Sequence, residues 1–434
     1  MAAVGGAREI VVIGGGTAGV RLAQRLAATA PAGTVNLTLL GEEPHAPYNR
    51  VLLAEVLAGR YAPEVIALPP VPGGERRGVR AVRIDRAARL VRCADGGVVP
   101  YDRLILATGS NPVLPPLRGL RRPDHDGLPE GVHAFRTMDD CLALSAAVRP
   151  GTRAVVIGGG LLGVSAARAL AERSAQVVLA QQGEHLMERQ LDRMGSRLLR
   201  AQLEAWGVEV HTECRVRGLV RTAGDTRVAA VELADGFRLD AELTVLACGV
   251  RPRTGLARAA GLDVRRGVVV DDELRTSDPS IHAIGDCAEH DERLYGLAGA
   301  ALEQADVLAR LLTVDPLARY TGTRSLTRLT LGALSSEARP EGPSEASPDV
   351  APEVPLDVAA FGETTPLPGD DTVQLTDATR GTYRKVVVRG DRLVGGVLLG
   401  DLATVGTLAR TWEDDVPLPP TTPLLHLLTP DGGS

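Results

Sequence analysis

Residues 9–19 read Glu-Ile-Val-Val-Ile-Gly-Gly-Gly-Thr-Ala-Gly, a short β-branched segment that runs into Gly14, Gly16 and Gly19. This is GxGxxG spacing, in which the first glycine allows a tight turn, the second lets backbone approach a pyrophosphate, and the third lets a helix pack on its strand. The helix expected from about Ala18 to Ala28 would direct its free N–H groups at the phosphates. Glycine-rich turns also follow many other buried strands, so this loop alone does not establish a nucleotide site.

The chain repeats this pattern further on. A second strand-like segment leads into Gly158, Gly160 and Gly163. The hairpin and buried strand over residues 94–109 also recur, without a gap, over residues 234–249. Two glycine loops and two such hairpins are far more specific than either feature alone, and they predict one dinucleotide in each half.

In folds of this kind, the second strand of each half ends where a ribose would lie, and an acid there accepts hydrogen bonds from the ribose hydroxyls. Glu42 takes this position in the first half, with a solvated surface carboxylate as the alternative. In the second half the position belongs to Gln181, which lacks the charge that repels a 2'-phosphate, and His185 and Arg189 follow it closely. The sequence therefore supports NADH and NADPH almost equally as the nucleotide. The alternative for His185 and Arg189 is that they are solvated residues at the start of a helix.

Two more charged residues are candidates for the first cofactor. Arg50 follows a proline-rich loop and could pair with a phosphate or cap a helix over residues 51–57. Asp286 follows a short strand beside Gly285, which suits hydrogen bonding to a polyol such as a ribityl chain. An Asx turn or a helix cap is the alternative for Asp286.

Composition narrows the class of protein. The 434 residues carry a formal net charge of −6, which gives no basic footprint for nucleic acid or an anionic membrane. The first residues lack the pattern of a secretory leader, and no apolar run reaches the ~18 residues that span a bilayer, so we expect a cytoplasmic protein. The five cysteines stand far apart, without a CxxC or a metal-ligand cluster, so we expect neither a metal nor a sequence-local redox disulfide.

The last third of the chain has a different character. Residues 335–355 are rich in Pro, Glu, Ser and Ala, which predicts a mobile loop. On either side of this loop, segments in which apolar and polar residues alternate, with a helix near residues 403–412, predict a small sheet domain.

Two further elements are expected earlier in the chain. Between the two halves, the prolines of residues 110–116 predict an extended hinge. In the second half, we expect a long helix over about residues 189–206.

Taken together, these residues resemble the two-dinucleotide FAD/NAD(P) reductases of the pyridine nucleotide-disulfide oxidoreductase type. The likeness is greatest to the N-terminal flavoprotein part of the NAD(P)H nitrite reductase large subunit and to the electron-transfer subunits of assimilatory nitrate reductase. The motifs that carry it are Glu42-Glu43-Pro44, Tyr48-Asn49-Arg50-Val51, Gly158 to Gly163, Leu186-Met187, Gln190-Leu191-Asp192, Gly249-Val250-Arg251-Pro252, Thr276-Ser277-Asp278-Pro279, Gly285-Asp286-Cys287-Ala288, Tyr383-Arg384-Lys385 and Gly400-Asp401.

This resemblance implies an α/β fold with two Rossmann-like dinucleotide-binding domains, the second inserted in the first, and a small C-terminal α+β domain. It implies an FAD domain over residues 1–112 and 250–320, an NAD(P)H domain over 113–249 and an interface domain over 321–425. The cofactor-binding residues it implies are Gly14, Gly15, Gly16, Thr17, Ala18, Gly19, Glu42, Arg50, Val82, Ala107, Thr108, Gly109, Gly285 and Asp286 in the first domain, and Gly158, Gly160, Leu161, Leu162, Gly163, Gln181, Arg189, Cys248 and Gly249 in the second.

The function implied is an FAD reductase that passes electrons from NAD(P)H to a separate redox protein, with no side chain acting as acid or base. Nitrate or nitrite assimilation is the first expectation, and a rubredoxin or ferredoxin as acceptor is the second. A non-catalytic FAD- and nucleotide-binding redox module is the third, and the oligomeric state stays open, a homodimer included. The sequence departs from the nitrite reductase pattern at Gln181 and Ser165, where that pattern has glutamate, and the iron–sulfur and sirohaem modules are not in this sequence. Lys385 is the one lysine of the chain.

Overall fold

The structure of the protein is a computed structural model that describes residues 7–121, 127–222, 227–324, 326–332, 356–377, 379–419 and 423–429. The loop expected over residues 335–355 lies outside the described residues. The chain forms two compact units, each described by itself below. Unit 1 comprises residues 1–53, 61–111 and 250–323, and unit 2 comprises residues 54–60, 112–249 and 324–434.

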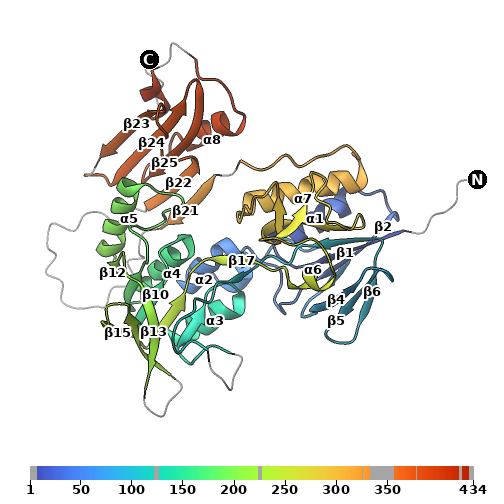
Figure 1. Ribbon diagram of the computed structural model, residues 1–434, viewed down its shortest axis with the longest axis horizontal. Helices are drawn as coiled ribbons and strands as arrows, with labels where there is room; N and C mark the ends of the chain where they lie inside the picture. Colours follow the sequence, from blue (N-terminus) through green and yellow to red (C-terminus); the bar gives the residue numbers. More distant parts are fainter. Residues whose placement is uncertain are drawn as a thin grey trace, which may run out of the picture. The chain divides into compact units, whose positions relative to one another are not determined.

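Unit 1 is built on a five-stranded parallel sheet. Its strand order is β19 (Ile281–Ala283), β7 (Arg103–Leu106), β1 (Arg8–Ile13), β2 (Val35–Leu40) and β3 (Gly74–Arg76). Residues 10–13 of β1 and 104–106 of β7 are continuous buried apolar runs, because the centre of a parallel sheet is covered on both faces. Helices α1 (Thr17–Thr29) and α7 (Ala298–Thr313) pack against each other, as Figure 1 shows, and Asp306 on α7 pairs with Arg21 and Arg25 on α1 at 2.8 Å.

Smaller elements complete unit 1. Strands β4 (Ala81–Asp85), β5 (Leu90–Cys93) and β6 (Val98–Pro100) form an antiparallel sheet, and β18 (Val268–Val270) pairs with β20 (Ala288–His290). The short helix α6 spans Gly255–Ala259.

Unit 2 contains a second five-stranded parallel sheet of the same kind. Its strand order is β12 (Val208–His211), β11 (Gln176–Ala180), β10 (Arg153–Ile157), β16 (Leu243–Leu246) and β9 (Val132–Ala134). Its helices are α3 (Met138–Ala147), α4 (Leu161–Glu172) and α5 (Arg193–Ala205). An antiparallel sheet of β13 (Val216–Arg221), β14 (Val228–Leu233) and β15 (Arg238–Asp240) precedes β16 in the chain.

The C-terminal part of unit 2 is an antiparallel sheet with one longer helix. Its strand order is β21 (Thr327–Leu331), β22 (Leu356–Gly362), β25 (Arg392–Leu399), β24 (Thr382–Arg389) and β23 (Asp371–Asp377). Helix α8 (Val405–Glu413) covers this sheet through Trp412, whose ring centroid lies 5.3 Å from that of Phe361. The expected fold class, two Rossmann-like domains with a small C-terminal α+β domain, is therefore confirmed.

Three expectations about local structure need correction. The long helix does not begin at Arg189: α5 begins at Arg193, because the Asp192 side chain caps it by accepting a hydrogen bond from Gly195 N–H at 3.0 Å. Residues 51–57 do not form one helix, since Arg50–Leu52 is a 3-10 turn and α2 covers only Leu53–Leu57.

The expected hinge begins as a strand. Residues Ser110–Pro112 form β8, which pairs with β17 (Val250–Pro252) where the chain returns to unit 1. Among the helices of the described ranges, none combines the length and the apolar character needed to cross a membrane.

Candidate cofactor sites

The first glycine loop lies at the carboxyl end of β1. Gly14 has a φ of +125°, and a Cβ there would lie 2.1 Å from the carbonyl oxygen of Ala107. A Cβ on Gly19 would lie 2.0 Å from the carbonyl oxygen of Gly14, so only glycine lets α1 approach this closely. A Cβ on Gly16 would meet no described atom within 4 Å beyond its chain neighbours, and its φ of −85° suits any residue. The open space beside Gly16 is what a pyrophosphate requires, so the loop fits the phosphates of FAD.

The loop continues into the uncapped start of α1. Gly15 faces the turn after β2, with its constructed Cβ 3.5 Å from Cα of Gly41. Thr17 and Ala18 begin α1, which has no side-chain cap. Gly285 approaches the same helix end, because a Cβ on it would lie 3.1 Å from Cβ of Ala18. First-turn N–H groups without a side-chain cap are available to an anion.

Glu42 lies beside Arg253, a residue that the sequence pattern did not single out. Arg253 Nη1 lies 2.6 Å from Glu42 Oε2, and Arg253 Nε donates to Asn111 Oδ1 at 2.6 Å. The main chain of Arg253 accepts a hydrogen bond from Thr108 Oγ1 and donates one to the carbonyl oxygen of Gly109, both at 2.9 Å. Arg253 therefore joins three of the predicted site residues at one edge of the sheet.

Asp286 lies at the same edge, in the 3-10 turn Gly285–Cys287 that follows β19. Its Oδ2 accepts a hydrogen bond from Ser110 Oγ at 2.8 Å. Asp286 is not a helix N-cap: Ile284 has that position for the turn, and Leu297 has it for α7. A carboxylate beside a hydroxyl at this edge is compatible with binding a polyol.

Arg50 has protein partners within its own loop. Its guanidinium pairs with the Glu43 carboxylate, donates to Tyr48 OH at 2.9 Å, and lies 5.0 Å from the centroid of the Tyr48 ring. The N-cap of the turn that Arg50 begins is Asn49. Contact between Arg50 and a phosphate stays a prediction.

Val82 lies on β4, outside the parallel sheet. The register of β4 against β5 shifts between Ala81 and Arg83, on either side of Val82, as in a β-bulge. Val82 is exposed. The segment is joined to the glycine-loop edge by Val79, whose N–H donates to the carbonyl oxygen of Gly41 at 2.8 Å. A bulged residue leaves backbone groups out of the ladder, and contact between Val82 and the cofactor stays a prediction.

The second glycine loop reproduces the first. Gly158 has a φ of +112°, with a constructed Cβ 2.5 Å from the carbonyl oxygen of Ala247, and a Cβ on Gly163 would lie 1.7 Å from the carbonyl oxygen of Gly158. A Cβ on Gly160 would again meet no described atom within 4 Å. Gly160 is the N-cap of α4, which has no side-chain cap and starts with the predicted residues Leu161 and Leu162. This loop therefore fits a second pyrophosphate.

Gln181 touches this loop directly. Its Oε1 accepts a hydrogen bond from Gly159 N–H at 2.8 Å. His185 lies in the segment that follows, where its Nε2 is 3.3 Å from the carbonyl oxygen of Leu191 and its buried Nδ1 has no hydrogen-bond partner among the described residues. Arg189 is exposed in a turn of the same segment. The structure thus places Gln181 at the loop and leaves Arg189 at the surface.

The cysteines supply no dithiol. All five lie within the described residues, and none of them forms a disulfide. Cys248, next to Gly249, is half-buried, with Sγ 3.5 Å from the carbonyl oxygen of Ile157, and burial raises its pKa to about 11. Within the described ranges, no group of three His, Cys, Asp or Glu residues could hold a metal ion.

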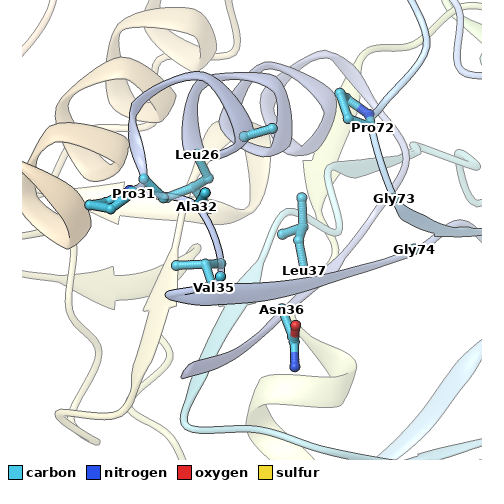
Figure 2. A pocket seen from close by; sticks show the side chains of 12 residues that line it. Leu26, Pro31, Ala32, Val35, Asn36, Leu37, Pro72, Gly73 and Gly74 are labelled. Carbon is cyan, nitrogen blue, oxygen red and sulfur yellow. The ribbon is translucent and has the colours of Figure 1, made fainter. Parts of the chain in front are cut away.

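A pocket on unit 1 lies away from these loops. Figure 2 shows it between the last turn of α1 and the start of β2, lined by Leu26, Pro31, Val35 and Leu37 among others, with a volume of about 360 Å³. The glycine loop is at the opposite, carboxyl end of β1 and at the first turn of α1, and the 13-residue helix spans roughly 20 Å. The pocket is therefore no part of the candidate cofactor site.

Comparison with known proteins agrees with this geometry. Residues 8–305 match the family described as pyridine nucleotide-disulphide oxidoreductase, and residues 354–414 match the rubredoxin NAD+ reductase C-terminal domain. The chain is 34% identical to nitrite reductase [NAD(P)H] of Bacillus subtilis (strain 168), over 91% of this chain and 46% of that protein. The chain therefore spans about half the length of that relative.

Two further matches cover most of both chains. The ferredoxin–NAD(+) reductase component of the biphenyl dioxygenase system of Paraburkholderia xenovorans (strain LB400) is 31% identical over 77% of this chain and 82% of that protein. The fold is also that of the reductase chain in the covalent putidaredoxin reductase–putidaredoxin complex, with a TM-score of 0.80 and 23% identity over 98% of this chain and 99% of that one. The expected cofactors, FAD and NAD(P)H, are those of this family. The chain therefore belongs to the pyridine nucleotide-disulphide oxidoreductase family, as an NAD(P)H-dependent FAD oxidoreductase.

Proposed function

We propose that this chain takes two electrons from NAD(P)H and passes them, through FAD, to a separate redox protein. The observation that carries the proposal is the pair of glycine loops, each at the carboxyl edge of its own parallel sheet and each with open space at its middle glycine. When bound, NAD(P)H would supply a hydride, and FAD would accept it together with a proton from water, release the two electrons one at a time and return two protons to water.

In this proposal the protein binds and orients. The Gly16 loop and the start of α1 hold the FAD pyrophosphate, Glu42 accepts hydrogen bonds from the adenosine ribose, and Asp286 accepts them from the ribityl chain. The Gly160 loop and the start of α4 hold the pyrophosphate of NAD(P)H. We assign FAD to residues 1–112 and 250–320, NAD(P)H to 113–249, and an interface role to 321–425.

The burial of the cysteines, and the lack of a disulfide among them, support a protein acceptor over a disulfide substrate. A reductase that acts on disulfides through its own thiols uses a pair of cysteines that become oxidised and reduced in turn. None of the five cysteines here forms a disulfide in the described residues, and burial raises the pKa of each. Electrons would therefore leave the flavin directly.

We propose nitrate or nitrite assimilation as the pathway and a rubredoxin or ferredoxin as the second candidate acceptor. The first is supported by likeness to nitrite reductase [NAD(P)H] over nearly the whole chain, and by 31% identity to the assimilatory nitrate reductase electron transfer subunit of Bacillus subtilis (strain 168). The second is supported by likeness to a ferredoxin–NAD(+) reductase component and by the match of residues 354–414.

The experiment is an anaerobic titration of the purified protein with NADH and then NADPH, followed by the loss of the flavin absorbance band. Rapid bleaching by either nucleotide is the expected result. Bound flavin that neither nucleotide reduces would contradict the reductase and favour a non-catalytic redox-binding module. Reduced protein is then mixed with a rubredoxin, a ferredoxin and a nitrite reductase haem subunit, and the acceptor that reoxidises it fastest identifies the partner class.

A further inference from the structure

Two motifs far apart in the sequence meet in unit 2. The Lys385 ammonium on β24 lies 2.7 Å from Asp192 Oδ2, and Tyr383 OH donates to the same oxygen at 2.7 Å. Both donors are buried, with Lys385 6% exposed and Tyr383 0%. Lys385 is the one lysine among 434 residues. A buried ammonium is costly unless it is paired, so this contact fixes where β24 meets Asp192.

Asp192 also begins α5. Its other oxygen, Oδ1, accepts the hydrogen bond from Gly195 N–H at 3.0 Å that caps the helix. Burial raises the pKa of Asp192, but the hydrogen bonds from Lys385, Gly195 and Tyr383 together lower it by more. The pKa of Asp192 therefore lies below its ordinary value. The carboxylate is therefore ionised at neutral pH, and one side chain serves both the helix and the C-terminal sheet.

The segment before Asp192 is bonded to the second glycine loop. Met187 N–H donates to the carbonyl oxygen of Gly159 at 2.9 Å, and Leu191 N–H donates to the carbonyl oxygen of Met187 at 2.8 Å. On the other side, Leu186 N–H donates to Ser196 Oγ, on the first turn of α5, at 2.8 Å. Residues 183–191 are thus held between the glycine loop and the capped end of α5.

We propose that Lys385 and Tyr383 are positioning residues for the NAD(P)H site. Acting through Asp192, they fix residues 183–191 against the Gly159 loop, so that nucleotide affinity depends on the C-terminal sheet. Without them the segment is less ordered before binding, and ordering it reduces the observed affinity. The inference rests on the proposed NAD(P)H site of unit 2, and it adds the C-terminal sheet to the groups that determine that site.

The test uses the FAD-loaded protein in rapid-reaction experiments. The dissociation constant of NADH or NADPH and the limiting rate of flavin reduction are measured separately from the dependence of the reduction rate on nucleotide concentration. Lys385→Met is expected to raise the dissociation constant about tenfold, which corresponds to roughly 1.4 kcal/mol. The milder Tyr383→Phe, which removes one hydrogen bond, is expected to raise it about threefold. The limiting rate and the FAD content should stay within about twofold of wild type.

Arg389→Met is the matched control, because Arg389 lies on the same strand and pairs with Asp370 and Glu363, not with Asp192. It should leave the dissociation constant unchanged. In the double variant Asp192→Asn with Lys385→Met, the dissociation constant should rise no further than in the single variant with the larger effect, because the two residues act through one contact.

Three results would overturn the inference. The first is an unchanged dissociation constant in both Lys385→Met and Tyr383→Phe, and the second is an equal rise of the dissociation constant in Arg389→Met. The third is a fall in FAD content or in the limiting rate while nucleotide affinity stays the same. If the proposed function itself were wrong, wild-type protein would show no flavin reduction by either nucleotide, which is a different result from these three.

Discussion

The backbone N–H of Gly159 donates a hydrogen bond of 2.8 Å to Oε1 of Gln181. Because the donor is an N–H group, the accepting atom must be the amide oxygen, and the NH2 group is what remains for a nucleotide. This group donates hydrogen bonds and carries no charge. At the proposed nucleotide site, a 2'-phosphate would therefore meet no negative charge at Gln181, whereas a ribose hydroxyl would lack the carboxylate acceptor that a glutamate would give it.

Gln181→Glu should therefore shift the nucleotide preference toward NADH. The new carboxylate can still accept the Gly159 hydrogen bond, and it adds a negative charge beside the expected position of the 2'-phosphate. We expect the ratio of kcat/KM for NADPH to that for NADH to fall by at least about tenfold, which corresponds to roughly 1.4 kcal/mol. The control is Gln182→Glu, which adds the same charge at an exposed neighbour. An equal fall in both variants would show that the position of the charge does not matter.

Gly16 and Gly160, the middle glycines of the two loops, allow the two cofactor sites to be tested separately. A Cβ on Gly16 or Gly160 meets no described atom within 4 Å, and both residues have ordinary φ angles of −85° and −79°. Alanine should therefore fold at either position, yet its methyl group would occupy the space that a pyrophosphate needs. We expect Gly16→Ala to lose FAD on purification, and Gly160→Ala to keep FAD and raise KM for nucleotide at least about tenfold. Flavin absorbance per protein and steady-state kinetics measure both effects. If both variants lost FAD alike, one site per loop would be wrong.

The ion pair between Glu42 and Arg253 predicts different results for its two members. Both side chains are more than two-fifths exposed, so the pair itself contributes little to stability. Glu42→Gln replaces the charged acceptor for the ribose hydroxyls with a neutral amide, and we expect FAD to dissociate about tenfold more readily. Arg253→Met leaves that acceptor in place, and we expect a change of less than about threefold. Equilibrium dialysis of FAD from each variant is the measurement. A larger loss in Arg253→Met would indicate that the arginine, not the glutamate, holds the cofactor.

The buried thiols predict how the protein reacts with thiol reagents. Burial raises the pKa of Cys141 and of Cys248 to about 11, and it raises the pKa of the other three cysteines as well. The thiolate is the reactive form, so reaction at neutral pH should be slow and should accelerate about tenfold per pH unit above pH 8. In protein unfolded in guanidinium, all five thiols should react rapidly with the reagent. Anaerobic reduction by NAD(P)H should expose no additional thiol, and an increase would reveal a redox disulfide.

The periodic parts of the fold were predictable because they depend on local sequence. The repeated glycine loops and buried strands indicated two Rossmann-like domains, and each unit has a five-stranded parallel sheet. The predicted start of α5 is too early because the segment before Asp192 has helix-compatible residues, whereas in the structure it forms turns and Met187 N–H donates to the carbonyl oxygen of Gly159.

Contacts between distant segments were beyond the reach of sequence patterns. Arg253 follows Pro252 directly, yet nothing in the sequence relates it to Glu42, 211 positions earlier. Likewise the contact between Asp192 and Lys385 joins residues 193 positions apart. Patterns of one sequence report periodicity and turns, whereas such pairs are determined by how the sheets pack.

A cluster of four charged residues joins α4 to residues 54–60: Arg168 and Glu172 on α4 are buried, and Glu55 and Arg60 are half-buried. Arg168, which is 0% exposed, pairs with Glu55 on α2, and its Nη1 lies 3.3 Å from Glu172 Oε2. Arg60 Nε lies 2.7 Å from Glu172 Oε1. Burial lowers the pKa of Arg168 although Glu55 and Glu172 raise it, and an arginine so paired stays charged at neutral pH. The cluster anchors residues 54–60, the short piece of the N-terminal part that belongs to unit 2.

Arg168→Met should destabilise unit 2 more than any surface substitution, because it leaves the Glu55 carboxylate without this buried partner. Breaking a buried ion pair from one side typically costs about 3–5 kcal/mol in the free energy of unfolding. Urea unfolding followed by tryptophan fluorescence is the measurement, since Trp206 and Trp412, the two tryptophans of the chain, both lie in unit 2. Adding Glu55→Gln to Arg168→Met should recover part of the loss, because Arg60, which lies 3.4 Å from Glu55, then has only the Glu172 carboxylate to neutralise. The control is Arg200→Met, which breaks an exposed pair on α5 and should cost less than about 1 kcal/mol. A loss as small as this in Arg168→Met would mean that the cluster does not anchor residues 54–60.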